Sequence, residues 1–142
     1  MAELEYFVVS RAVSRDLGSD ELSFLGVLED IKPVRLPGVL PRVVAVSVWR
    51  ITEEERAGEF QAMLRILRPG EVAAEATEFS MNLAQGHLRY RAIQMVTEIP
   101  VEQPGFLSFE VLLNGHHAAS HLVTIHPPEE TGEIPESGPS IC

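Results

Sequence analysis

The stretch at residues 106–125, FLSFEVLLNGHHAASHLVTI, constrains the fold more than any other part of the chain. Two runs of alternating apolar residues flank Asn114-Gly115, a dipeptide that is the strongest short-range signal for a two-residue β-hairpin. Because a two-residue loop fixes how the strands pair, the sequence also predicts which side chains share a face. Four of the five histidines lie in or directly after this stretch, so the pairing bears on function as well as on fold.

Segments with the pattern of β-strands follow one another up to residue 126. Eight such segments are separated by Gly, Pro, Asn or charged residues. They lie at about 4–14, 21–31, 42–51, 59–68, 71–81 and 87–99 and in the two arms of the hairpin. This spacing predicts an all-β fold, a single antiparallel β-sandwich of seven or eight strands with immunoglobulin-like layering. A closed antiparallel β-barrel is the alternative.

Residues 42–51, RVVAVSVWRI, are apolar at nearly every position, which predicts a central strand covered on both faces. The loop before this strand contains Pro33, Pro37, Gly38 and Pro41 and is too rich in proline for an interior strand. Residues 71–81 form the weakest of the strand-like segments, because EVAAEATEF fits a helix equally well.

Residues 59–68 fit two patterns. Their apolar residues have the spacing of an amphipathic helix, and Thr52 with Glu55 forms a capping-box pattern before them. Every second residue from Phe60 is also apolar, and Gly58 would cost a helix about 1 kcal/mol. We interpret 59–68 as a strand, preceded by at most one helical turn at 53–57.

Composition predicts one domain and a tail. A chain of 142 residues is long enough for one domain with its own core, which we place at residues 1–126. Residues 127–142, PPEETGEIPESGPSIC, contain four prolines and four glutamates and predict an acidic, flexible tail. The single cysteine, Cys142, excludes an internal disulfide framework and a cysteine-based zinc site.

The charge of the chain excludes several partners. The formal net charge is −10, from 21 acidic and 11 basic residues, so duplex nucleic acid and anionic membranes would be repelled. No apolar run approaches the roughly 18 residues of a membrane span. Glu3 and Glu5 stand where a signal peptide would be basic. We therefore expect a cytoplasmic protein that binds neither nucleic acid nor membrane.

Four motifs resemble those of an uncharacterised bacterial family known only as a domain of unknown function. These motifs are LSFLGVLEDI at 22–31, PGVLPR at 37–42, LRILRPGE at 64–71 and FEVLLNG at 109–115. The resemblance spans most of residues 4–125 and implies a small, soluble antiparallel β-domain with a strand at 59–68. It implies no activity, cofactor or catalytic residue.

With Asn114-Gly115 as the turn, Leu113 pairs with His116 and Leu112 with His117. Counting back, Ser108 faces His121, with Glu110 next on the same face. These three residue types are those of a nucleophile, a base and an orienting acid. A flat sheet uses its backbone N–H groups in the ladder and leaves no oxyanion hole. We therefore interpret Ser108, Glu110 and His121 as a polar patch, and a hydrolase as the less favoured alternative.

His117 and His121 are candidate metal ligands only by type. On one strand they would lie roughly 13 Å apart, too far to chelate one ion, so we predict no metal site and no cofactor. Arg89 and Arg91 are expected to share a face with His87, and the three could hold an anion. Cross-strand pairing with the many carboxylates of the chain is the favoured interpretation of these arginines.

The function that the sequence favours is a non-enzymatic protein-binding or assembly module. Sandwiches present edge strands, which proteins must cover or use. A homodimer would form through such an edge, or through a face on which Phe106, Leu112 and Val123 are expected among polar residues. A small-ligand carrier is the alternative if the strands close into a barrel around a cavity.

Overall fold

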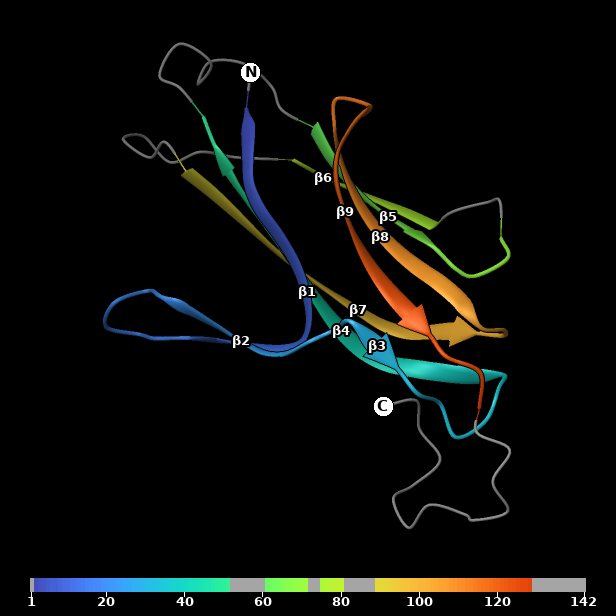
Figure 1. The fold of residues 1–142 in the computed structure, drawn as a ribbon. Coiled ribbons are helices and arrows are strands. Elements are labelled where there is room, and N and C mark those ends of the chain that lie inside the picture. Colours follow the sequence, from blue (N-terminus) through green and yellow to red (C-terminus); the bar gives the residue numbers. More distant parts are fainter. Residues whose placement is uncertain (1, 52–60, 72–74, 81–88, 129–142) are drawn as a thin grey trace.

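A computed structural model of the protein describes residues 2–51, 61–71, 75–80 and 89–128 (Figure 1). The described residues form two sheets that lie in two layers, and neither sheet closes into a barrel. The four-stranded sheet has the order β2-β1-β4-β7 and the five-stranded sheet the order β3-β9-β8-β5-β6. The strands are β1 (Glu3–Arg15), β2 (Leu22–Val27), β3 (Asp30–Ile31), β4 (Gly38–Arg50), β5 (Gln61–Leu67), β6 (Glu75–Ser80), β7 (Arg89–Val101), β8 (Gly105–Leu113) and β9 (His116–Ile125). The predicted sandwich is confirmed, and the barrel alternative is wrong.

The core lies between the two layers. Trp49 of β4 and Phe109 of β8 are its largest fully buried side chains, and both sheets contribute branched apolar residues around them. The indole N–H of Trp49 donates a hydrogen bond of 2.9 Å to the hydroxyl oxygen of Ser47, which satisfies two buried polar groups at once. Each sheet therefore buries one of its faces in the core of the sandwich.

Strand β4 is also covered on its outer face. Val44, Val46 and Val48 point away from the sandwich core and are nonetheless 0–5% exposed. The hairpin of β1 and β2 covers them with three side chains, those of Val13, Leu22 and Phe24. The prediction that residues 42–51 form a central strand covered on both faces is thus confirmed.

Two strand boundaries differ from the expectation. Residues 21–31 form two strands in different sheets, because Gly26 adopts a positive φ of 69° and the chain then crosses to the other layer, where β3 pairs in parallel with β9. Strand β4 begins at Gly38 rather than 42 and includes Pro41. This proline is tolerated because it has no partner in the register with β7, and because β1 pairs only with residues 44–50 of β4.

The other disputed segments are strands where the structure describes them. Residues 61–67 form β5, between β8 and β6, so the strand predicted at 59–68 is confirmed for 61–67, and residues 59–60 lie outside the described part of the chain. Residues 75–80 form β6. The helical turn expected at 53–57 and all of the predicted tail except Pro127 and Pro128 lie outside the described residues.

The turn at Asn114-Gly115 is confirmed, but the pairing beyond it is not. Asn114 and Gly115 have φ values of 50° and 84°, as a type I′ turn requires. Pairing is as predicted for the first two residue pairs, and then a β-bulge leaves Ala118 without a partner on β8. From there on, every β9 residue is shifted by one.

The bulge exchanges the faces of the second half of β9. Ser108 pairs with Leu122 instead of His121, and Phe109 pairs with His121. Uninterrupted pairing would have turned Leu122 inward. The bulge instead buries Val123 and Ile125 (0% and 1% exposed) and leaves Leu122 56% exposed. Burying two branched side chains in place of one favours the bulged register.

Candidate functional site

The β8–β9 hairpin does not assemble the predicted hydrolase site. Ser108 and Glu110 lie on the outer face of the five-stranded sheet, whereas the bulge turns His121 to the inner face. The nucleophile and the base of that hypothesis are therefore separated by the thickness of the sheet. The expected grouping of Ser108, Glu110 and His121 is wrong, because no pattern in the sequence predicts the bulge at Ala118 of β9.

His121 of β9 instead contacts β1 and the segment that connects β2 to β3. Its Nδ1 accepts a hydrogen bond of 3.3 Å from the N–H of Val9 on β1, and its Nε2 lies 2.5 Å from the carbonyl oxygen of Leu28. The N–H of Leu28 donates directly to the carbonyl of Val9 at 3.0 Å. The imidazole thus replaces the second hydrogen bond that this antiparallel pair would form. Both contacts require the neutral ring with its proton on Nε2.

A second polar cluster lies on the outer face, where Arg65, Glu110, His117 and Ser120 meet. Nε of Arg65 lies 3.0 Å from one oxygen of Glu110, and Nε2 of His117 lies 3.3 Å from the other. The same Nε2 lies 2.7 Å from the hydroxyl oxygen of Ser120. The sequence interpretation missed Arg65 and Ser120, because the cross-strand neighbour of Glu110 on β5 and the bulge on β9 only become visible in the structure.

This outer cluster lacks the geometry of a catalytic triad. In a triad the acid orients one ring nitrogen while the other faces the nucleophile. Here Glu110 and Ser120 both contact Nε2 of His117, and Glu110 is already paired with Arg65. The arrangement is that of a polar network on an open sheet face.

The structure supports no metal site in the part of the chain that it describes. His117 and His121 point to opposite faces of the five-stranded sheet. No group of three or more potential ligands among His, Cys, Asp and Glu occurs within the described ranges.

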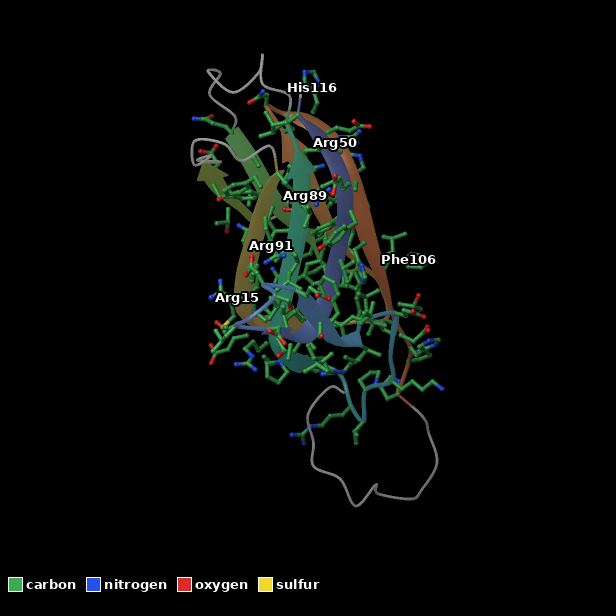
Figure 2. The ribbon with its side chains drawn as sticks, turned by 90° about the vertical axis from the view of Figure 1, so that its left-hand side faces the viewer. Arg15, Arg50, Arg89, Arg91, Phe106 and His116 are labelled. Carbon is green, nitrogen blue, oxygen red and sulfur yellow. The ribbon has the colours of Figure 1, made fainter. Side chains whose placement is uncertain are left out.

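The arginines of β7 are paired with carboxylates of the same chain. Figure 2 shows Arg15, Arg50, Arg89 and Arg91 on the four-stranded sheet, with Phe106 on the other side of the molecule. Arg89 lies 2.9 Å from a carboxylate oxygen of Glu5, and Arg91 lies 3.4 Å from Asp20 and donates to its backbone carbonyl at 3.0 Å. Arg89 therefore pairs with a carboxylate on another strand, and Arg91 pairs with one in the turn between β1 and β2. His87, the third candidate of the predicted anion site, lies outside the described residues.

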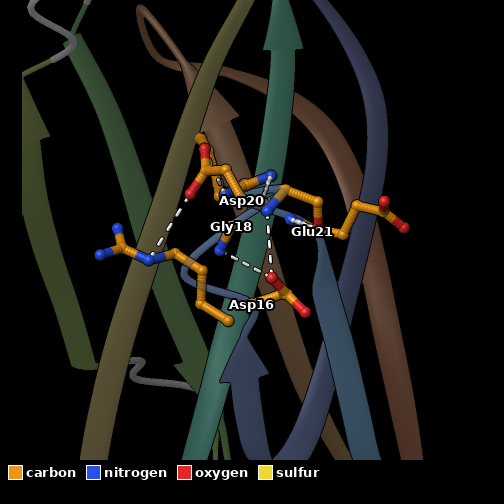
Figure 3. Close-up of polar contacts among 7 residues, drawn as sticks. Asp16, Gly18, Asp20 and Glu21 are labelled. Carbon is orange, nitrogen blue, oxygen red and sulfur yellow. Dashed lines mark hydrogen bonds and ion pairs between the residues drawn. The ribbon is translucent and has the colours of Figure 1, made fainter.

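The turn that supplies Asp20 is ordered by another carboxylate (Figure 3). Oδ1 of Asp16 accepts the backbone N–H groups of Gly18 at 2.7 Å and Ser19 at 3.0 Å. These two hydrogen bonds lower the pKa of Asp16, and the bond from Ser19 has the larger effect of the two. Asp20 has a positive φ of 62° and contacts Arg15 as well as Arg91. The turn thus fixes the tip of the β1–β2 hairpin beside β7.

Only one of the three residues of the predicted interface is available on the surface. Phe106 is 63% exposed, but Leu112 is 7% exposed and Val123 is fully buried in the core. Leu122 takes the place expected for Val123, diagonal to Phe106 across β8 and β9. The expected exposure of Leu112 and Val123 is therefore wrong, and the exposed apolar residues on this face are Phe106 and Leu122.

The edge of β7 is a further exposed surface, which the sequence interpretation missed. Ile93 and Met95 are 48% and 61% exposed, although they pair with the buried Val46 and Val44 of β4. A usable signal was present in the sequence. Arg89, Arg91, Ile93 and Met95 alternate along one strand, so two apolar residues follow two arginines on the same face.

Solved structures include a distant structural neighbour of this chain. The structure is similar to that of Pseudomonas fluorescens alkylpurine DNA glycosylase AlkC bound to DNA containing an abasic site analog, with 16% sequence identity and a TM-score of 0.47. The similarity covers 87% of this chain and 30% of the glycosylase chain, so this protein spans less than a third of that length. No match was found among curated proteins. In the described segments, no helix has the length and apolar character needed to cross a membrane.

The family comparison is more direct. A model described as a family of unknown function, DUF6941, matches residues 5–126. The match runs from β1 to the end of β9 and includes all four motifs on which the resemblance was based. The chain therefore belongs to the family of unknown function DUF6941.

Proposed function

We propose that this protein is a non-enzymatic module that binds another protein through the free edge of β7. The observation that carries the proposal is that β7, a 13-residue strand at the end of its sheet, pairs with β4 and with no other described strand. A row of unpaired backbone N–H and C=O groups is a template for a strand from another chain.

The register identifies the backbone groups that face this edge. The N–H and C=O groups of Val9 are bonded on the side away from β4. In an antiparallel pair, the backbone N–H and C=O groups of two opposed residues either point toward each other or point away from each other. The backbone groups of Ala45, the partner of Val9, therefore point toward β7 and bond to Gln94. Alternation along β7 then turns the backbone groups of Ile93 and Met95 outward.

The side chains at the same positions favour association. The β1–β2 hairpin covers the outer valines of β4 but leaves Ile93 and Met95 beside them exposed. Burial of exposed apolar side chains contributes about 25 cal/mol for each Å² removed from water. A strand that paired with β7 would therefore gain apolar contacts in addition to backbone hydrogen bonds.

The C-terminal end of this edge is protected by its backbone. Glu98 has a positive φ of 53°, and Pro100 lacks an N–H group. Bends and prolines are means by which proteins block edge pairing. Residues 91–97 lie before both features and form the available segment.

The other end strands are shorter templates for pairing with a partner strand. β2 and β6 have six residues each and β3 has two. Charged residues on an edge discourage pairing, and β6 carries Glu75 and Glu78 within its six residues, whereas residues 92–97 of β7 carry no charge. Among the end strands in the described part of the chain, β7 is thus the longest template.

The two alternative functions receive less support. A hydrolase would need Ser108 near His121, and they lie on opposite faces of the sheet. A small-ligand carrier was tied to a closed barrel, and the two described sheets do not close. A cytoplasmic location in a bacterium, based on the lone cysteine and the family resemblance, is part of the same proposal.

The proposal is tested by capture from a lysate of the native host. Tagged wild-type protein is compared with Ile93→Lys and Met95→Lys, which place charges on the edge, and with Leu122→Lys as the matched control. Leu122 is similarly exposed, at 56%, but lies on the other sheet. We expect proteins captured by the wild type to be lost from both β7 variants and kept by the control. Identical capture by all four folded proteins would overturn the proposal.

A further inference from the structure

We infer that the strand which pairs with β7 is the β7 of a second copy, joined antiparallel about a two-fold axis at Gln94. The inference rests on the proposed function and adds the identity of the partner. Closed two-fold dimers are the commonest form of self-association, and they require a surface that is complementary to itself. The β7 edge meets that requirement in charge and in register.

The charges of β7 favour an antiparallel copy. Arg89 and Arg91 lie at its N-terminal end, its centre is uncharged, and Glu98 lies near its C-terminal end. An antiparallel copy brings the basic end of each strand near the acidic end of the other. A parallel copy would place arginines beside arginines, which is destabilising.

The apolar side chains select the register. With the axis at Gln94, Ile93 of one copy lies opposite Met95 of the second, and this contact occurs twice. Arg91 then lies opposite Thr97, and the four most exposed apolar side chains of the two edges are covered together. An axis at Ile93 would instead place each Met95 opposite an arginine, so the register centred on Gln94 buries more apolar surface.

The resulting assembly joins two four-stranded sheets into one continuous sheet. Pairing of residues 91–97 from each copy makes a small interface, at the low end of those in stable complexes. We therefore expect a dimer with a dissociation constant in the range of about 1–100 μM rather than nanomolar. The net charge of −10 on each copy will make the dimer stronger at higher ionic strength.

The first experiment measures association of the full chain by sedimentation equilibrium over a concentration series. Wild type should show a monomer–dimer equilibrium, and Met95→Lys should raise its dissociation constant by about tenfold or more, since the two-fold axis places each substitution in the interface twice. Leu122→Lys should leave the constant unchanged. A dimer that Met95→Lys leaves intact overturns the inference, because another surface then holds it.

The second experiment traps the register by oxidation. In a Cys142→Ser background, Gln94→Cys places two thiols at the axis, where directly opposed residues have Cα atoms about 4.5 Å apart, within disulfide reach. Leu17→Cys is the control, because Leu17 is 92% exposed at the tip of the β1–β2 hairpin. Rapid covalent dimer formation by Gln94→Cys alone supports the inference, and equal rates for the two variants overturn it.

The two proposals fail in different ways. A wild-type chain that stays monomeric up to about 100 μM, with no Gln94→Cys dimer, overturns the second copy as the partner. If the β7 variants still lose a captured protein in that case, the free edge keeps its proposed function with a different strand donor. If they lose none, both proposals fall.

Discussion

The outer faces of the two sheets differ in what covers them. On the four-stranded sheet, the chain folds its own β1–β2 hairpin over the outer valines of β4, and Asp20 at the tip of this hairpin is tied to Arg91. On the five-stranded sheet, the corresponding face of β8 and β9 carries a polar network around Glu110 together with the exposed Phe106 and Leu122. The outer face of β4 therefore forms a second small core, and the outer face of β8 and β9 is exposed to solvent.

The difference between the two outer faces follows from the sequences of β4 and β8. β4 is apolar at successive positions, as expected of a strand that is buried on both sides. β8 alternates over most of its length, as expected of a strand with one wet face. An apolar outer face therefore indicates that another segment covers it. The β1–β2 hairpin does not cover Ile93 and Met95, and these exposed side chains are part of the surface that we propose to bind a partner.

The largest expected effect breaks the covered face. Val46→Asp would place an unpaired carboxylate at a position that is 0% exposed, and we expect a loss of about 3–5 kcal/mol in the free energy of unfolding. Leu122→Asp, on the uncovered face, should change it by less than about 0.5 kcal/mol. Urea denaturation of both variants measures the contrast. Similar losses for the two would mean that the two outer faces do not differ as described.

A second pair of variants compares the inner and outer faces of β9. His121→Ala removes the imidazole that bridges Val9 and Leu28 and should cost about 1–3 kcal/mol, because two partly buried backbone groups lose their partner. His117→Ala removes a half-exposed ring and should cost under about 0.5 kcal/mol. The comparison uses thermal and urea denaturation. Equal costs would contradict the role assigned to His121.

A third prediction concerns the turn that sets the register of the uncovered face. Gly115 has a φ of 84°, and a Cβ atom there would meet nothing within 4 Å, so Gly115→Ala adds backbone strain and no collision. We expect a loss of about 1–2 kcal/mol. Gly115→Asn is the matched variant, since asparagine tolerates positive φ better, and it should recover part of the loss in the same denaturation assay. No difference between the two would argue against strain as the cause.

The smallest effect concerns the hairpin that covers β4. The pKa of Asp16 is lowered in the folded protein, so its contribution to stability is complete above the ordinary value of 3.8 and is lost as the pH falls through the lowered value. Asp16→Asn should be less stable than the wild type at neutral pH, and the difference should narrow below about pH 4. Thermal melts at a series of pH values test this. A difference that is independent of pH would exclude the carboxylate charge as its source.

The fold could be predicted from the sequence because its signals are local. Alternation, the Asn114-Gly115 turn and the apolar run of β4 each depend on neighbouring residues. The site could not be predicted in the same way. The bulge at Ala118 depends on which residues of β9 pack best against the distant four-stranded sheet, and no local pattern marks it. The grouping of Ser108 with His121 failed for this reason, as did the exposure expected for Val123.

The unpartnered Ala118 has a consequence for how sequences of this family should be aligned. Deleting this one residue would remove the bulge and leave His121 opposite Phe109 on the inner face, because the residues after Ala118 would keep their partners on β8. A relative that lacks this residue would therefore present the same side chains on each face of β9, whereas a chain that kept it and paired without the bulge would turn Leu122 inward and His121 outward. A gap in β9 should therefore be placed at the bulge, so that the histidine that ties the two layers together stays aligned among relatives.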